Sequence, residues 1–257
     1  MTLETTLPEV QSEYVLAGAL QMYCETQGQG RPLLLLHAGM ATIQTSFEKS
    51  RPILAKRWMT IAVEQQAHGH TADINRSLTY EQMVEDTASL LRQKKISNAD
   101  VFGWSDGGIV ALGLAARHPD LVRKVATIGS GYNTDAWSPD FKARQAAIRP
   151  DNAHTLPFRD AYRTVASKPE DWPLLIEKLK AMWTGFKGWS DAELRSLKAP
   201  LMVMLGDDDV IRPEHALELF RMVPSGRLAI LPGSDHSAPV TRNDWVTSML
   251  VDFFYSA

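Results

Sequence analysis

Short apolar runs recur along the chain, separated by longer segments in which apolar residues return at helical spacing. Leu33 to Leu36 is an uninterrupted apolar run, as in strands that are buried on both faces of a sheet. Similar runs predict strands at residues 58–63, 98–104, 124–129, 200–205 and 227–231. Between the runs, the periodicity predicts helices at residues 47–56, 109–118 and 213–223, and a last helix through Trp245 and Phe253. This alternation predicts an α/β fold with a mostly parallel sheet and helices on both of its faces.

Two further elements complete this core. Residues 14–25 alternate between apolar and polar positions around Gly18, which predicts a hairpin at one edge of the sheet and makes the sheet eight-stranded. Thr79 and Gln82 have the spacing of a capping box and predict the start of a helix. The apolar positions of that helix fall on one face: Met83, Thr87, Leu90 and Leu91.

The alternation breaks between residues 134 and 198, where prolines interrupt short helical runs and no strand pattern occurs. Four of the seven tryptophans lie in this segment: Trp137, Trp172, Trp183 and Trp189. This segment could be a long surface loop, but so many aromatic side chains need apolar surroundings. We therefore predict a core made of residues 1–133 and 199–257, with a helical cap of residues 134–198 inserted between two strands of the sheet.

The composition limits the classes of molecule that the chain is expected to bind. The 257 residues carry a formal net charge of −3 without a lysine or arginine cluster, so we expect neither a nucleic acid nor a membrane partner. A small-molecule partner is expected instead. Cys24 is the single cysteine, which excludes an intramolecular disulfide and a cysteine-based zinc site.

The N-terminal segment lacks the basic and then apolar pattern of a signal peptide, and no run has membrane-spanning length. The expected location is therefore the cytoplasm. The oligomeric state is left open between a monomer and a homodimer.

Ser105 is the strongest candidate for a nucleophile. The apolar run that ends at Trp104 meets a serine flanked two residues away by Gly103 and Gly107, and an apolar, alanine-rich helix follows. This is the pattern of a sharp strand-to-helix turn that exposes a nucleophile and needs glycine on both sides. Ser190 offers a contrast, because the same tetrapeptide recurs there without a preceding strand or a closing glycine. Ser190 with Glu193 instead predicts a capping box.

Acidic and basic partners follow Ser105 in the chain. Asp207, Asp208 and Asp209 come after one predicted strand, and His236 comes after the next. Ligands of parallel sheets bind beyond the carboxyl ends of the strands, and the order serine, acid, histidine is that of hydrolases with a nucleophile elbow. Adjacent aspartates cannot all face one ion, so no metal site is expected.

Five stretches together resemble the α/β-hydrolase superfamily over nearly the whole chain. They are His37-Ala38-Gly39, Glu64 to Thr71, the elbow from Gly103 to Gly107, Gly206 to Asp209 followed by Pro213, and Gly233 to His236. Glu64, Ala67 and Thr71 depart from the family's pattern in the second stretch, and Ala38 departs from it in the first. The elbow Gly-Trp-Ser-Asp-Gly-Gly also resembles that of valacyclovir-hydrolase-like esterases.

The resemblance implies a catalytic triad of Ser105, His236 and an acid. Asp209 fits the family spacing best, while Asp207, Asp208 and Asp135 remain alternatives. The backbone amides of Asp106 and of Met40 or Gly39 would form the oxyanion hole, and Met40 is favoured.

Side chains around the substrate are predicted from the same resemblance and from the aromatic content of the cap. They are His37, Trp104, Trp137, Phe141, Trp172 and Trp183. His37 and His68 are expected to brace their own loops by hydrogen bonding. The carboxylate of Asp106 either caps the following helix or recognises a substrate ammonium group.

The implied activity is that of a cofactor-free serine hydrolase, which cleaves a small or medium carboxylic ester or a lactone through an acyl-enzyme on Ser105. The fold also hosts C–C bond hydrolases and cofactor-free perhydrolases. A receptor for a small molecule that retains the triad is an alternative of a different class.

Overall fold

Eight strands form one sheet in the order β1-β2-β4-β3-β5-β6-β7-β8 in the computed structural model, which describes residues 7–256. β1 pairs antiparallel with β2, β2 pairs antiparallel with β4, and the remaining pairs are parallel. The strands are β1 (Gln11–Ala17), β2 (Leu20–Gln27), β3 (Pro32–Leu36), β4 (Met59–Val63), β5 (Ala99–Trp104), β6 (Val122–Ile128), β7 (Leu201–Asp208) and β8 (Gly226–Asp235). The predicted fold class is confirmed.

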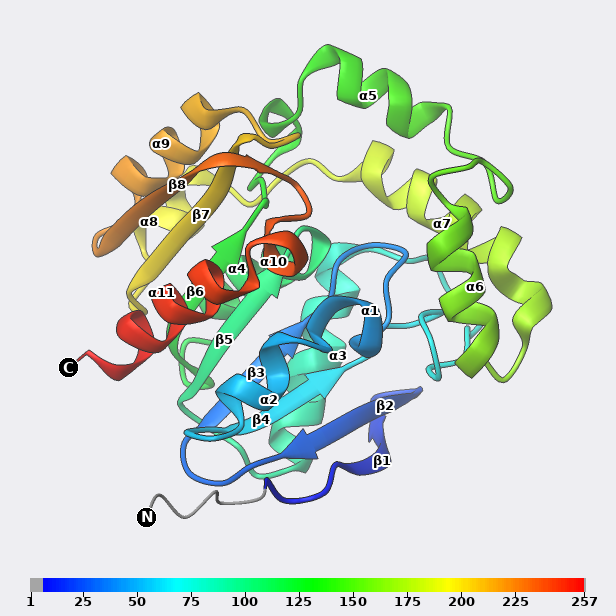
Figure 1. Cartoon of the computed structure of the whole chain (residues 1–257), viewed down its shortest axis with the longest axis horizontal. Coiled ribbons are helices and arrows are strands. Elements are labelled where there is room, and N and C mark those ends of the chain that lie inside the picture. The colour runs from blue at the N-terminus through cyan, green and yellow to red at the C-terminus, as the bar shows by residue number, and fades with distance from the viewer. Residues whose placement is uncertain (1–6, 257) are drawn as a thin grey trace.

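Helices cover both faces of this sheet (Figure 1). α3 (Tyr80–Gln93), α4 (Asp106–Arg117) and α9 (Pro213–Met222) pack on one face, and α1 (Ile43–Phe47), α2 (Ser50–Leu54), α10 (Ala238–Thr241) and α11 (Asn243–Tyr255) pack on the other. The central strand β3 serves both layers, because Leu34 and Leu36 join the first core and Leu33 and Leu35 join the second. An uninterrupted apolar strand is the sequence signature of this two-sided burial.

The predicted helix over residues 47–56 is wrong, since two short helices, α1 and α2, stand in its place. Pro52 accounts for the difference. A continuous helix would have placed this proline in its interior, whereas α2 begins at Ser50 and leaves Pro52 in the first turn, where no amide donor is needed. The predicted hairpin is present as β1 and β2, with Gly18 in the turn at φ +62°.

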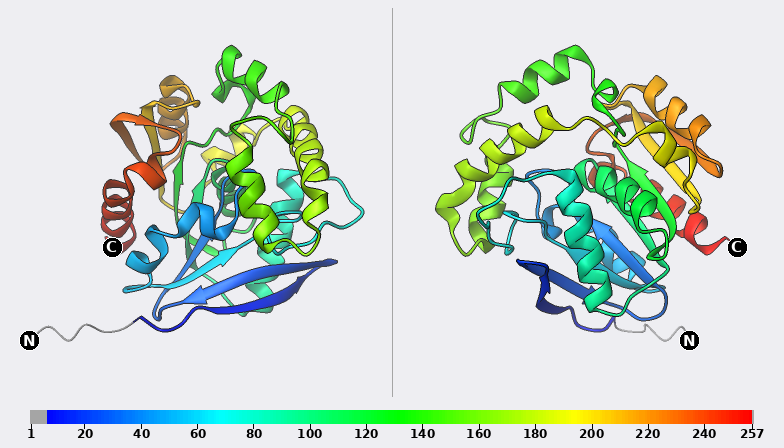
Figure 2. Two further views of the ribbon diagram at one scale, coloured as in Figure 1. Left: turned by 45° about the vertical axis from the view of Figure 1, so that its right-hand side comes forward. Right: turned by 180° about the vertical axis from the view of Figure 1, so that it is seen from behind.

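Residues 134–198 all lie within the described part of the chain. They form helices and contain no strand of the sheet. The helices are η1 (Thr134–Ala136), α5 (Pro139–Ala146), α6 (Leu156–Val165), η2 (Pro169–Asp171), α7 (Trp172–Gly185) and α8 (Asp191–Arg195). Figure 2 shows α5, α6 and α7 arching along one side of the molecule. α7 buries six side chains, whereas α5 buries none.

The capping box predicted at Ser190 is present and opens α8, with Ser190 Oγ accepting from the Glu193 amide at 3.3 Å. At Thr79 only half of the predicted box forms. The Thr79 side chain accepts from the Gln82 amide, while the Gln82 side chain donates to Asp86 instead. Among residues 7–256, no helix is long and apolar enough to cross a membrane.

Candidate active site

Ser105 stands on the sharp turn between β5 and α4. Its backbone has φ 55° and ψ −121°, a conformation that is costly for any residue other than glycine and that recurs at functional sites. The two flanking glycines allow the turn. A Cβ at Gly103 would lie 2.3 Å from the Gly107 carbonyl oxygen, and a Cβ at Gly107 would lie 2.1 Å from the Leu36 carbonyl oxygen.

A chain of hydrogen bonds links Ser105 to the ends of β7 and β8. His236 Nε2 lies 3.0 Å from Ser105 Oγ, and His236 Nδ1 lies 2.8 Å from Asp209 Oδ1. The Asp209 side chain is 1 % exposed and also accepts from the Ile211 amide at 3.3 Å. The three residues therefore have the connectivity that a base and its orienting acid require.

The other acidic candidates do not reach the histidine. Asp207 accepts a hydrogen bond from the Ser234 amide at 3.1 Å and so ties together the two loops that carry Asp209 and His236. Asp135 lies in η1, and Asp208 is exposed at the end of β7. Trp104 Nε1 donates to the His236 carbonyl oxygen at 3.0 Å and further fixes the histidine loop.

The loop after β3 brings Gly39 and Met40 to the same cavity as Ser105 and Asp106. Met40 has φ +61°, an uncommon value for a residue with a side chain. Within residues 7–256, the amides of Met40 and Asp106 donate to no protein acceptor. Both amides are therefore free to bind an anionic oxygen.

His37 lies behind this loop and not in the cavity, which corrects its predicted place among the pocket residues. It is 3 % exposed, its Nδ1 lies 2.8 Å from the Ala38 carbonyl oxygen, and its Nε2 accepts from the Gln65 amide at 3.0 Å. Burial lowers the pKa of His37, so the ring is neutral and Nδ1 is the donor. The expected bracing role follows from these contacts.

Glu64 is one of the residues at which the chain departs from the family's loop pattern, and its side chain forms hydrogen bonds that hold the loop. Its carboxylate accepts from the Ile43 amide at 3.1 Å and from the His70 amide at 2.6 Å. His70 Nδ1 lies 2.9 Å from the same carboxylate, and this hydrogen bond raises the pKa of His70. In the same loop, burial lowers the pKa of His68 to about 3.

The carboxylate of Asp106 is held by two aromatic side chains. Tyr80 Oη donates to Oδ1 at 2.7 Å, and Trp183 Nε1 donates to Oδ2 at 2.9 Å. The residue is 9 % exposed, and burial raises the pKa of its carboxyl group. Both oxygens thus bond to side chains and not to the backbone, so the carboxylate makes no capping hydrogen bond, although it stands in the first turn of α4, where the helix dipole favours a negative charge.

Ser105 opens into a cavity of about 590 Å³ that is lined by residues of the sheet core and of segment 134–198. Four of the side chains that were predicted around the substrate line this cavity, namely Trp104, Trp137, Phe141 and Trp183. Trp172 does not. It is 2 % exposed and its Nε1 donates to the Pro150 carbonyl oxygen at 2.8 Å, because it anchors the start of α7.

Sequence reasoning missed the polar residues of the cavity wall. Arg144, Gln145, Asn152 and His154 all line the cavity. A signal for Arg144 was present, since it follows Phe141 by three residues and therefore shares one face of a helix with it. Within the described residues, no group of three or more histidine, cysteine or acidic side chains is placed to hold a metal ion.

The sheet order, the turn at Ser105 and the three linked side chains define the architecture of an α/β hydrolase. A model of the alpha/beta hydrolase family matches residues 33–248, and the chain belongs to this family. The chain is thus a hydrolase.

Relatives and solved structures agree with this assignment. Serine hydrolase BPHL of Mus musculus is 25 % identical over 253 residues, covering 95 % of this chain and 86 % of the mouse protein. The pimeloyl-[acyl-carrier protein] methyl ester esterase of Vibrio vulnificus strain YJ016 is 25 % identical over 265 residues, covering 90 % of this chain and 97 % of that protein. The structure of carboxylesterase CesB from Bacillus subtilis superposes with a TM-score of 0.81 at 18 % identity, covering 97 % of this chain and 93 % of that one.

Proposed function

We propose that this hydrolase cleaves a small or medium carboxylic ester, or a lactone, through an acyl-enzyme on Ser105. The observation that carries the proposal is the hydrogen-bonded series from Ser105 through His236 to Asp209, at 3.0 Å and 2.8 Å. Relatives named as ester hydrolases support the same bond type.

The first half of the reaction forms the acyl-enzyme. As Ser105 Oγ attacks the ester carbonyl carbon, its proton passes to His236 Nε2. The carbonyl oxygen becomes an oxyanion, which the amides of Met40 and Asp106 bind; one such donor contributes about 2.7 to 4 kcal/mol to transition-state stability. The intermediate then expels the alkoxide, which takes the proton from His236 and leaves as an alcohol. In a lactone this alcohol stays attached to the acyl group.

The second half releases the acid. Water attacks the acyl carbon while His236 takes its proton, and the intermediate collapses to a carboxylic acid as His236 returns a proton to Ser105 Oγ. Asp209 holds the Nδ1–H tautomer throughout and stabilises the imidazolium that forms in each half.

We also propose that residues 134–198 act as a cap that shapes the substrate. Trp137 and Trp183 from this segment line the same cavity as Ser105 and Trp104 from the core. A wall with many aromatic residues excludes water and suits an apolar substrate body. The volume of about 590 Å³ fits a small or medium molecule.

Other chemistries of this fold, namely C–C bond hydrolysis and perhydrolysis, use the same groups, and the comparisons do not favour them over ester hydrolysis. A triad-retaining receptor would bind its ligand with little turnover. A panel of esters, assayed with and without peroxide, separates these alternatives from simple hydrolysis.

Incubation with a fluorophosphonate followed by intact mass measurement tests the proposal. We expect one adduct on the wild type and none on Ser105→Ala. The absence of an adduct on the wild type, or an equal adduct on the variant, would contradict the proposed nucleophile.

A further inference from the structure

The lining of the cavity holds one arginine and two histidines but a single acidic side chain, although acidic residues outnumber lysines and arginines in the whole chain, 30 to 27. Besides His236, two side chains that can be cationic line the cavity, namely Arg144 and His154. Both residues are exposed overall, so they form the rim of the cavity rather than its floor. Asp106 is the one acidic residue in the lining.

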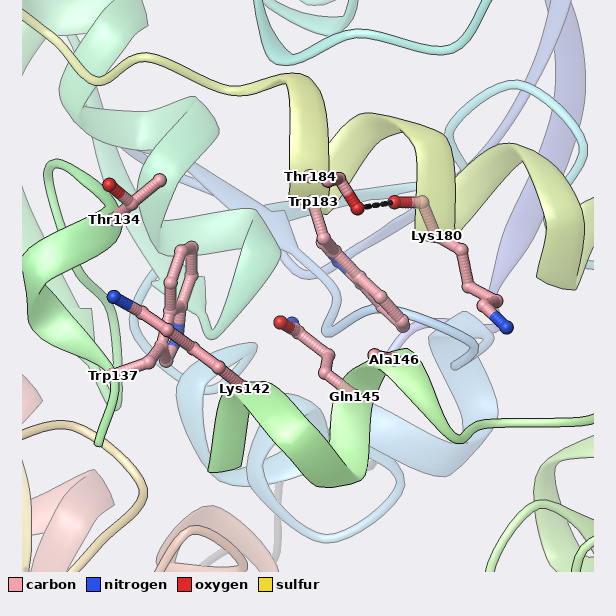
Figure 3. Close-up of a pocket in the computed structure, with 8 residues that line it drawn as sticks. All are labelled: Thr134, Trp137, Lys142, Gln145, Ala146, Lys180, Trp183 and Thr184. Atoms are coloured by element: carbon pink, nitrogen blue, oxygen red, sulfur yellow. Dashed lines mark hydrogen bonds between the residues drawn. The ribbon is translucent and has the colours of Figure 1, made fainter. Parts of the chain in front are cut away.

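A second hollow of about 260 Å³ continues this charge pattern between α5 and α7 (Figure 3). It shares Trp137, Gln145 and Trp183 with the main cavity, so the two spaces adjoin at these side chains. Lys142 and Lys180 line the hollow, and no acidic residue does. Two lysines thus line the space that adjoins the cavity.

Arg144 has no ion-pair partner within residues 7–256. Its guanidinium carbon lies 5.6 Å from the centre of the Phe141 ring, a contact that leaves the N–H groups free to donate. A guanidinium presents its donors in a planar fork that matches a carboxylate with two parallel hydrogen bonds.

Asp106 does not cancel this preference at the rim. Its two carboxylate oxygens already accept hydrogen bonds from Tyr80 and Trp183, and it lies at the floor beside Ser105. Apolar side chains complete the lining, among them Ile109, Phe158 and Val210. The cavity thus combines a reactive floor, an apolar wall and a cationic rim.

From this arrangement we propose that the rim at Arg144 is a carboxylate-binding subsite. The substrates are then esters or lactones whose apolar body carries a free carboxylate away from the scissile bond, as in a monoester of a dicarboxylic acid. The substrate class rests on the proposed ester hydrolysis, whereas the binding of a carboxylate at Arg144 does not.

Three para-nitrophenyl esters of similar length test the proposal: the adipate monoester, the neutral heptanoate and the cationic ε-aminocaproate. We expect the wild type to prefer the adipate monoester. Arg144→Gln should lower kcat/KM for that ester roughly tenfold, mainly through KM, as for the loss of a partly exposed charged hydrogen bond. The heptanoate has no carboxylate for Arg144 to bind, so its kcat/KM should fall far less than that of the adipate monoester. Arg144→Lys should restore part of the preference because it keeps the charge without the fork.

Arg149→Gln is the matched control, because Arg149 is an exposed arginine five residues further on that lines neither space. It should leave all three esters unchanged. An equal fall in activity on the adipate monoester and the heptanoate in Arg144→Gln would overturn the subsite. A wild-type preference for the ε-aminocaproate would also overturn it, and would support ammonium recognition by Asp106 instead.

A binding measurement separates failure of the subsite from failure of the proposed function. Calorimetric titration of adipate into Ser105→Ala should show binding that is about tenfold weaker once Arg144→Gln is added. Equal affinity in the two proteins refutes the subsite. A third outcome is possible: the wild type hydrolyses none of the three esters, yet adding Arg144→Gln to Ser105→Ala weakens adipate binding. That outcome upholds the subsite and rejects the ester activity.

Discussion

Tyr80→Phe removes a single hydroxyl that holds the carboxylate beside the nucleophile. The Tyr80 hydroxyl donates to Asp106 Oδ1 at 2.7 Å, and Tyr80 is fully buried at 0 % exposure. The ring of Phe would keep the edge-to-face contact with Phe186, whose ring centre lies 4.6 Å away. The substitution therefore removes a hydrogen bond to a charged group and little else.

When the Asp106 carboxyl group is ionised, the expected cost is about 1.5 to 3 kcal/mol of unfolding free energy, the usual contribution of a hydrogen bond to a charged group. In a protein of this size, each kcal/mol lowers Tm by roughly 2 to 4 °C. Tyr162→Phe provides the matched control. Tyr162 is 5 % exposed, but its hydroxyl donates to an uncharged carbonyl, that of Lys168, at 3.4 Å. Its loss should cost about 0.5 kcal/mol.

Urea unfolding of Tyr80→Phe, Asp106→Ala and the double variant measures the coupling between the two side chains. We expect a coupling free energy of about 1.5 to 3 kcal/mol, because Tyr80→Phe costs little once the carboxylate is gone. A cost of Tyr80→Phe no larger than that of Tyr162→Phe, or an unchanged cost in the Asp106→Ala background, refutes the reasoning.

The cost of Tyr80→Phe in unfolding free energy should depend on pH in one direction. Burial raises the pKa of Asp106 in the folded state, so the ionised carboxylate lowers stability as the pH rises above its unfolded pKa. Loss of the Tyr80 donor raises the folded pKa further. The cost of Tyr80→Phe should therefore shrink as the pH is lowered through the folded-state pKa of Asp106.

Two further substitutions test the site and the loop behind it. Asp209→Asn should lower kcat about ten-thousandfold with the fold retained, because an amide in this position favours the wrong histidine tautomer; steady-state kinetics measure this. His70→Asn should reduce the unfolding free energy at low pH and have less effect as the pH rises. The hydrogen bond to Glu64 raises the folded pKa of His70, so its stabilisation is complete below the unfolded pKa of about 6.5 and is lost as the pH passes the folded pKa.

Each of these substitutions has a control in the chain. Asp208→Asn should leave kcat within about twofold, since Asp208 is exposed and does not contact His236; equal losses in the two variants would remove Asp209 from its proposed role. For stability, His154→Asn should cost less than about 0.5 kcal/mol, because His154 is exposed. A cost of His70→Asn that is the same at every pH would rule out the ion pair with Glu64.

Local patterns in the sequence account for most of the core. Buried parallel strands read as apolar runs, and the elbow needs glycines at fixed spacing, so β3, β5 and Ser105 could be located without a structure. The prediction of one helix at 47–56 was wrong because it rested on apolar periodicity and did not take account of Pro52. Similarly, the apolar character of Trp172 placed it in the pocket, although its side chain anchors α7 instead.

The sequence by itself determined the order of strands and helices, the turn at Ser105 and the chain order of the serine, acid and histidine candidates. These features depend on neighbours within a few residues or on the ends of successive strands. Only the tertiary structure decided that Asp209 contacts His236, that Tyr80 and Trp183 hold Asp106, and that Arg144 stands at the cavity rim. Such contacts join residues far apart in the chain, and their partners depend on how segment 134–198 packs over the sheet, which local spacing does not encode.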